Sequence, residues 1–413
     1  MIEHKVSYKG SCSGRVNRRG RVGVEKYIDK QVALYIALLA LISCLFIHSS
    51  TEAFPQYTGS FVIKQIIFYI LGFSMMLAVA SLDLEQLKQI SWYAYAVIVL
   101  LLIGLIFAPE SIARPVNEAK AWYQIKFLGS IQPSEFLKFA FVLVIAKVME
   151  KHYTITEEPS FVSDCRLLCK VAIITIPPML IVYQQPDTGM ILLYAALLAP
   201  MVFFSSINKK LLITVAAIPV TLGIGIIIVY FQFHDFYQEE LLGRLSGHQV
   251  SRINGWLQPF EYEASSYQTR QGMTAIGTGE LTGKGYLSND VYIPEKHTDF
   301  IFSTIAEETG FIGGSIIILL YFLLLYRLVV IVIKARTRFA YITGAGIIGL
   351  LTFQIFQNIG MTMGLLPVTG VTLPFLSYGG SSLLSNFLLL GVILSFRKTY
   401  DNYFFLSRNG DDE

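Results

Sequence analysis

Ten apolar segments, each close to the length of a membrane-spanning helix, constrain this sequence more than any other feature. A helix needs about 20 apolar residues to cross a bilayer. The segments lie at residues 32–48, 61–80, 91–108, 133–149, 167–184, 188–204, 211–231, 312–333, 341–363 and 381–397. With only 15% charged residues, the chain has too little polar surface for a soluble domain of 413 residues. The sequence therefore predicts an all-α, polytopic membrane protein with about ten transmembrane helices, and excludes a soluble enzyme, a disordered chain and a disulfide scaffold.

The positions of Lys and Arg predict how these segments are oriented. Cytoplasmic loops of membrane proteins are enriched in both residues. Here they are concentrated before the first segment, in alternate connections and after the last segment, whereas the connections 49–60, 184–187 and 364–380 contain none. Both termini are therefore expected to be cytoplasmic.

This topology divides the chain into five parts. They are a basic cytoplasmic tail (1–30), spans one to seven (31–231), a large extracytoplasmic loop (232–302), spans eight to ten (303–397) and a second cytoplasmic tail (398–413). Functional residues often lie on loops that a rigid scaffold holds in place. The segment 364–380 is apolar and rich in Gly and Pro, which predicts a re-entrant-like loop buried in protein. The functional site is thus expected at the outer face.

Three acidic positions near that face allow two interpretations each. Glu135 and Lys138 open span four, where charges are costly unless they pair or meet water. They form either an intrahelical ion pair or the lining of a polar cavity. Asp187, between two spans, is interpreted first as an N-cap, with a site role as the alternative. Asp299, at the end of the large loop, is either an N-cap or a general base whose pKa is raised by apolar surroundings.

Cysteine and histidine indicate no resident metal or redox centre. The four cysteines and six histidines form no metal-ligand spacing. Motifs of metalloproteases, nucleotide-binding loops and serine hydrolases are also missing from the sequence. The cysteines are therefore interpreted as free thiols.

Four blocks of the sequence resemble the SEDS family of membrane proteins, which includes RodA, FtsW and SpoVE. They are residues 132–138, 271–285, 297–310 and 358–382. The third contains His297-Thr298-Asp299-Phe300, and the fourth begins with Asn358-Ile359-Gly360-Met361. These motifs are more similar to the RodA branch than to FtsW. In the second block, Glu280 stands where the family usually has Gly.

The resemblance implies a peptidoglycan glycosyltransferase that polymerises lipid II at the outer face of the bacterial cytoplasmic (inner) membrane. It would serve cell-wall elongation and cell shape beside a class B penicillin-binding protein, with no nucleic acid partner. The resemblance assigns catalysis to Asp299 and importance to Glu135 and Lys138. The region 114–122 lacks the family's Gly-rich run, which weakens the assignment of substrate contacts to Lys120 and Trp122.

A mechanism consistent with these residues is a single inverting displacement. Asp299 would take the proton from the GlcNAc 4-hydroxyl of an acceptor lipid II. That oxygen would attack the anomeric carbon of the donor MurNAc, and undecaprenyl pyrophosphate would leave. The predicted substrate-binding residues are Glu135, Lys138, Arg252, Lys120, Trp122, Gln271 and Ser377.

The leaving pyrophosphate requires positive charge. The loop 232–302 carries nine acidic but only five basic residues, so the candidates are few. They are Arg252, Lys138, Lys120 or a bound divalent cation, Mg²⁺ or Mn²⁺; no other cofactor is expected. Three alternatives stay open: a division-type, FtsW-like glycosyltransferase, a transporter that flips lipid II, and a scaffold for the penicillin-binding protein.

Overall fold

The computed structural model describes residues 28–54, 60–113, 120–125, 129–155, 160–185, 187–233, 236–237, 240, 242–244 and 247–398. The two predicted cytoplasmic tails, 1–30 and 398–413, lie almost entirely outside these residues. The same holds for most of the region 114–122, including its departure from the Gly-rich pattern.

Each of the ten predicted spans corresponds to a helix. They are α1 (Lys30–Glu52), α2 (Phe61–Ala80), α3 (Leu84–Phe107), α4 (Pro133–Ile155), α5 (Phe161–Gln184), α6 (Thr188–Phe203), α7 (Lys209–Gln232), α11 (Ile301–Lys334), α12 (Arg338–Thr362) and α13 (Gly380–Ser395). Seven of them are long and apolar enough to cross a membrane, whereas α6 and α13 are shorter apolar helices and α4 carries several charges. The chain is thus an all-α polytopic membrane protein, as predicted.

Capping residues extend several helices beyond their apolar segments. The α3 helix begins at Leu84, not at 91, because Asp83 and Gln86 form a capping box in which Gln86 Oε1 accepts the Asp83 N–H at 2.8 Å. Similarly, Ser160 caps α5 through the N–H of Ser163 at 3.2 Å. Hydropathy locates the apolar part of a helix, but a polar first turn is set by its cap.

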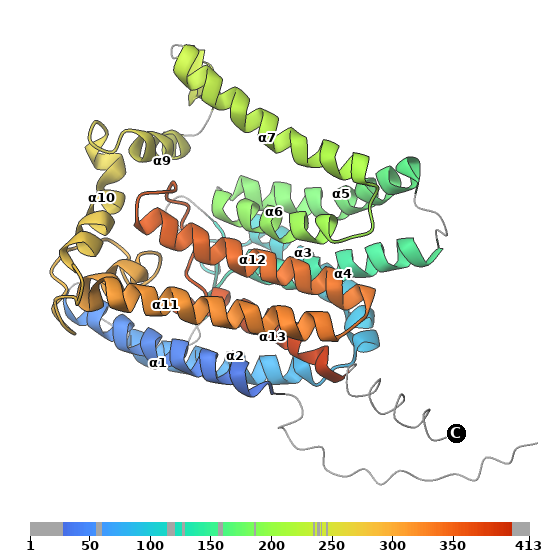
Figure 1. Cartoon of the computed structure of the whole chain (residues 1–413), viewed down its shortest axis with the longest axis horizontal. Helices are drawn as coiled ribbons and strands as arrows, with labels where there is room; N and C mark the ends of the chain where they lie inside the picture. The colour runs from blue at the N-terminus through green and yellow to red at the C-terminus, as the bar shows by residue number, and fades with distance from the viewer. Residues whose placement is uncertain are drawn as a thin grey trace, which may run out of the picture.

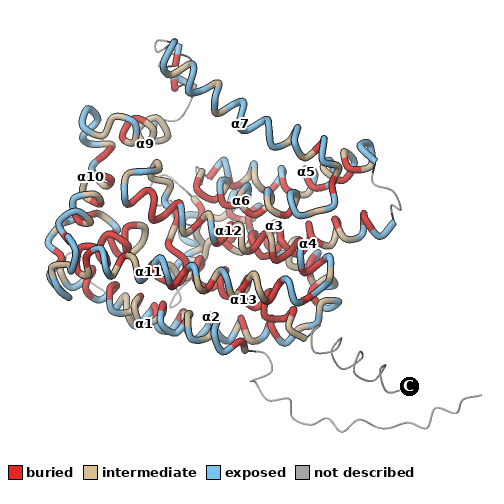
Figure 2. The backbone as a smooth tube through the Cα atoms, viewed as in Figure 1, coloured by how far each residue is buried: buried red, intermediate tan, exposed pale blue. Residues whose placement is uncertain are grey.

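The helices pack as a bundle in which α4 and α13 are largely buried (Figures 1 and 2). The closest pairs are α2 with α13, α6 with α12, and α3 with α4. The α7 helix diverges from the bundle: Leu211 is its one buried residue, and the rest of its apolar surface is half-buried or exposed (Figure 2). Such a surface suits a lipid environment.

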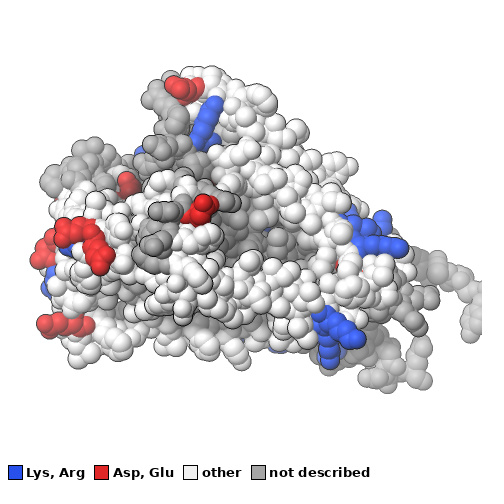
Figure 3. Space-filling view, turned by 90° about the horizontal axis from the view of Figure 1, so that it is seen from above, with Lys and Arg blue, Asp and Glu red and all other residues white. Residues whose placement is uncertain are grey.

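Charge differs between the two ends of the bundle. On the face shown in Figure 3, Asp and Glu gather toward the end with α9 and α10, and most Lys and Arg lie toward the opposite end. This asymmetry follows the sequence pattern on which the orientation was predicted.

The large loop 232–302 contains regular structure. It includes a short 3-10 helix η3 (Leu242–Arg244), α9 (Gly247–Leu257) and α10 (Glu263–Thr278). Before α4, a hairpin of β1 (Tyr123–Ile125) and β2 (Gly129–Ile131) pairs Tyr123 with Ile131.

The α11 helix begins 11 residues before the predicted span at 312 and is broken at Gly310, where φ is 66° and ψ −162°. The backbone groups freed by the break bond to the segment 280–285. Phe311 N–H donates to the Glu280 carbonyl at 2.9 Å, and Lys284 N–H donates to the Glu307 carbonyl at 3.0 Å. Hydropathy missed this first half because its polar residues interrupt the apolar pattern, while their pairing within the protein keeps it helical.

Candidate active site

The turn that carries Asp299 is held by three consecutive hydrogen bonds. The backbone carbonyls of residues 297–299 each accept one bond from α12 or the segment 364–380. The donors are the Tyr378 N–H at 3.0 Å, Ser377 Oγ at 2.6 Å and Asn358 Nδ2 at 2.7 Å. Because these bonds engage successive residues, they fix the path of the backbone that presents the Asp299 side chain.

The segment 364–380 also approaches the Asp299 carboxylate. A Cβ atom added at Gly370, where φ is +72°, would lie 3.6 Å from Asp299 Oδ2. One residue earlier, the Thr369 carbonyl packs so closely on α6 that a Cβ at Gly189 would lie 2.6 Å from its oxygen. The segment is therefore wedged between the start of α6 and Asp299. It is non-helical and largely buried from Val371 to Ser377.

Asp299 itself lies just outside the helical part of α11 and is partly buried. The pKa of its carboxyl is raised to about 6, chiefly by removal from water and also by the carboxylates of Glu295 and Asp187, while Arg252 opposes the rise. A carboxyl with this pKa is mainly ionised at neutral pH yet more basic than an ordinary Asp. Such a group is suited to general base catalysis near pH 7.

Asp187 is both a helix cap and a neighbour of Asp299. Its Oδ1 accepts the Met190 N–H at 3.1 Å, which confirms the N-cap interpretation, and its Oδ2 accepts from Gln132 Nε2 at 2.7 Å. Its pKa is raised to about 6, chiefly by burial and also by the charge of Glu135, against the lowering effects of its hydrogen bonds to Met190 and Gln132 and of the Arg252 charge. The alternative of a site role thus gains support, because the tertiary structure brings Asp187 into electrostatic contact with three predicted site residues.

Arg252, in α9, is the cation shared by these carboxylates. Burial lowers the pKa of its guanidinium, and the charges of Asp299 and Asp187 counteract that effect. The large loop therefore brings a positive charge into the electrostatic environment of Asp299 and Asp187.

Glu135 and Lys138 form the predicted intrahelical ion pair, with Lys138 Nζ 2.5 Å from Glu135 Oε2. Lys138 is fully buried and Glu135 is 7% exposed. The adjacent Ser134 Oγ is buried with no hydrogen-bond partner among the described residues. The same holds for both amide atoms of Gln185, the residue that follows α5. Buried polar atoms usually bind protein, water or a ligand, so the polar-cavity interpretation stays open beside the ion pair.

The other predicted binding residues lie in different settings. Ser377 Oγ is engaged within the protein, because it donates to Thr298 and accepts the Leu373 N–H at 2.8 Å. Lys120 Nζ donates to the Ala108 carbonyl at the C-terminal end of α3. Trp122, beside β1, and Gln271, in α10, are half-buried. Substrate contacts of these four residues remain predictions.

Several residues that shape this site were missing from the sequence-based set. Asn358 and Gly370 position Asp299, and Lys296 and Glu307 form a buried ion pair behind it. The motif around Asn358 was a signal, but no sequence spacing indicates which carbonyl its amide binds. Within the described residues, no three His, Cys, Asp or Glu side chains are grouped as metal ligands. The divalent cation therefore remains a prediction.

The family described as "Cell cycle protein", that of FtsW, RodA and SpoVE, matches residues 29–402. The chain belongs to this family. Stage V sporulation protein E of Bacillus subtilis is 29% identical over 384 residues, which cover 91% of this chain and 98% of that protein. Peptidoglycan glycosyltransferase RodA of Treponema pallidum is 28% identical, with 89% and 97% covered. A probable peptidoglycan glycosyltransferase FtsW of Coxiella burnetii is 31% identical, with 82% and 86% covered.

Solved structures share the fold. A chain from a peptidoglycan synthase complex that coordinates polymerization and crosslinking superimposes with a TM-score of 0.70 at 24% identity, covering 90% of this chain and 98% of that one. RodA of Thermus thermophilus gives 0.61 at 24% identity, with 90% and 97% covered. Members of all three branches are similar to this chain to nearly the same degree, so similarity does not select a branch.

Proposed function

We propose that this protein is a peptidoglycan glycosyltransferase that polymerises lipid II at the outer face of the cytoplasmic membrane, in cell-wall elongation and cell-shape maintenance. The names of its relatives support the reaction. The observation that carries the proposal is Asp299, a carboxyl with a pKa of about 6 on a turn fixed by hydrogen bonds and within the electrostatic influence of Arg252. The role in elongation rests on the RodA-like motifs; a division role is the alternative.

In this proposal Asp299 is the general base. Its carboxylate takes the proton of the acceptor's GlcNAc 4-hydroxyl as that oxygen bonds to the anomeric carbon of the donor MurNAc. The bond from this carbon to the pyrophosphate oxygen breaks, and undecaprenyl pyrophosphate leaves with the electron pair. The displacement inverts an α linkage into the β linkage of the glycan. A positioned general base typically contributes 10²–10⁴-fold to the rate.

Positive charge for the leaving pyrophosphate comes from Arg252, with Lys138 as the second candidate. A guanidinium binds phosphate oxygens in a bidentate manner and stays charged even when partly buried. The charges of Asp299 and Asp187 already act on the Arg252 guanidinium, so an incoming pyrophosphate would compete with these carboxylates for it. The apolar surfaces of the spans would hold the polyprenyl tails.

The proposed setting is the bacterial inner membrane, with both termini in the cytoplasm and a class B penicillin-binding protein as partner. The basic residues at the end of the bundle opposite α9 and α10 support this orientation (Figure 3). The partner is proposed because the similar chain of known structure belongs to a complex that couples polymerization with crosslinking.

The test is polymerisation of purified lipid II by the reconstituted chain with its penicillin-binding partner. Asp299→Asn protein that folds and binds the partner is expected to lose at least about 10²-fold in rate. Glu263→Gln is the matched control, because it neutralises a carboxylate of the same loop whose side chain is 77% exposed. Wild-type rates from Asp299→Asn would reject the general base.

Failure of folded, partner-bound wild-type protein to form polymer would reject the glycosyltransferase itself. The second candidate is a lipid II transporter, which the buried Glu135–Lys138 pair favours because charged residues within spans mark substrate pathways. Movement of lipid II across liposomes without polymer would support that candidate.

A further inference from the structure

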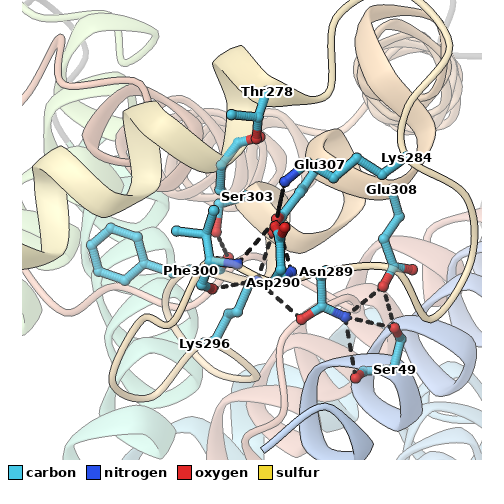
Figure 4. Close-up of polar contacts among 12 residues, drawn as sticks. Ser49, Thr278, Lys284, Asn289, Asp290, Lys296, Phe300, Ser303, Glu307 and Glu308 are labelled. Atoms are coloured by element: carbon cyan, nitrogen blue, oxygen red, sulfur yellow. Dashed lines mark hydrogen bonds and ion pairs between the residues drawn. The ribbon is translucent and has the colours of Figure 1, made fainter.

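The carboxylate of Glu307 bonds to Lys284, to the backbone at 290–291 and to Lys296 of the Asp299 turn (Figure 4). It is fully buried in the first half of α11. Its Oε2 lies 2.8 Å from Lys296 Nζ, and its Oε1 lies 2.8 Å from Lys284 Nζ. Oε1 also accepts the backbone N–H groups of Asp290 at 3.1 Å and Val291 at 3.2 Å. One side chain thereby bonds to three stretches of the loop that precedes α11.

Lys296 is the member of this cluster that belongs to the Asp299 turn. It is fully buried and lies three residues before Asp299. Besides Glu307, its ammonium donates to Asn289 Oδ1 at 3.1 Å and to the Val291 carbonyl at 2.9 Å. An ammonium has three protons, so these partners satisfy it completely and fix its position.

The cluster continues to a different part of the bundle through Asn289. The Asn289 amide donates to Ser49 Oγ in α1 at 2.9 Å and to Glu308 Oε1 at 2.5 Å (Figure 4). The anchor of Lys296 is therefore tied to both α1 and α11. Because both helices belong to the rigid bundle, Lys296 is fixed relative to the bundle and not only to its own loop.

The two ends of the turn are held in different ways. The carbonyls of residues 297–299 are bound by α12 and the segment 364–380, whereas the side chain of Lys296 is bound by Glu307. Stability alone does not account for such a pair, because apolar residues of similar volume often replace a buried ion pair without loss. A role in fixing the geometry of Asp299 would explain why the ion pair of Lys296 and Glu307 is found here and not an apolar contact.

We infer that Lys296 and Glu307 are positioning residues for Asp299, and that their ion pair sets where the carboxylate stands relative to the acceptor hydroxyl. The inference rests on the proposed function of Asp299. Displacement of a catalytic group by about 1 Å can reduce the rate about 10²-fold. Loss of the anchor therefore affects the chemical step and leaves substrate binding largely unchanged.

The experiment compares Lys296→Met with Lys284→Met. Each variant removes one lysine from Glu307 and leaves the other at 2.8 Å, so the carboxylate keeps a cation in both. Only Lys296 lies in the Asp299 turn. The expected result is a kcat for lipid II polymerisation at least about tenfold lower in Lys296→Met, with KM changed less than about threefold and both constants near wild type in Lys284→Met. Equal losses in the two variants, or no loss in Lys296→Met, would overturn the inference.

A second measurement separates this inference from the proposed function. Amide hydrogen exchange of the peptide 294–300 is expected to be faster in Lys296→Met and unchanged in Lys284→Met, whether or not the protein polymerises lipid II. Unchanged exchange in Lys296→Met would show that Lys296 does not hold the turn. If Lys296→Met does not fold, the double variant Lys296→Met, Glu307→Gln replaces it under the same criteria, because it removes both charges of the buried pair together.

Discussion

Asn358 Nδ2 in α12 donates hydrogen bonds of 2.7 Å to two backbone carbonyls, those of Asp299 and Val371. One buried amide therefore joins the turn of the proposed base to the segment 364–380. A backbone carbonyl left without a partner in a buried site costs about 1–3 kcal/mol.

Asn358→Leu is expected to lower the free energy of unfolding by about 2–4 kcal/mol and to reduce polymerisation, because both carbonyls lose their donor. Thermal unfolding and the lipid II assay measure the two effects. Gln357→Leu is the control, since the Gln357 amide donates to the Pro367 carbonyl at 2.9 Å and, among the described residues, makes no hydrogen bond to the Asp299 turn. Equal losses of activity at equal stability would contradict a specific link to Asp299.

The rate of polymerisation should depend on pH through Asp299. A general base acts when it is deprotonated, so kcat is expected to rise as pH increases through about 6 and to level off above it. Arg252 lowers the pKa of Asp299, so Arg252→Gln should move this rise to higher pH. Glu295 raises the pKa, so Glu295→Gln should move it to lower pH. A rise at the same pH in all three proteins would exclude Asp299 as the titrating group.

The Glu135–Lys138 pair can be tested for a role beyond folding. Lys138→Met leaves a buried carboxylate without its cation and is expected to destabilise the protein by about 3–5 kcal/mol. The double variant Glu135→Gln, Lys138→Met removes both charges and should regain most of that stability. If the pair contacts lipid II, the double variant stays inactive although it folds. Recovery of wild-type polymerisation would restrict the pair to a structural role.

Glu280 occupies a backbone conformation that favours glycine, with φ of 47°. A residue with a side chain costs about 1 kcal/mol in this left-handed region. Glu280→Gly is thus expected to raise the midpoint of thermal unfolding without loss of activity, because the Glu280 carbonyl still accepts the Phe311 N–H. Thr282→Gly, at an exposed position without positive φ, should give no such gain. A gain from both substitutions would exclude backbone strain as the cause.

The sequence by itself determined the ten helices that correspond to the predicted spans, the family, and the place of Asp299 at the end of the large loop. Apolar segments of membrane-spanning length must form helices here, since every backbone polar group in a bilayer must be hydrogen-bonded within the protein. The sequence motifs around Asp299 and Asn358 were specific enough to indicate which part of the chain contains the site.

Only the tertiary structure decided which residues stand around that site. Asp187 was interpreted first as a cap, and its approach to Glu135 and Arg252 depends on how α4, α6 and α9 pack. The Lys296–Glu307 pair and the break of α11 at Gly310 likewise depend on the segment 280–291, which bonds to α11 from outside the helix. Local propensity and hydropathy describe a residue's own neighbourhood in the chain. The partners of a buried charge are set by elements that are distant in sequence and adjacent only after folding.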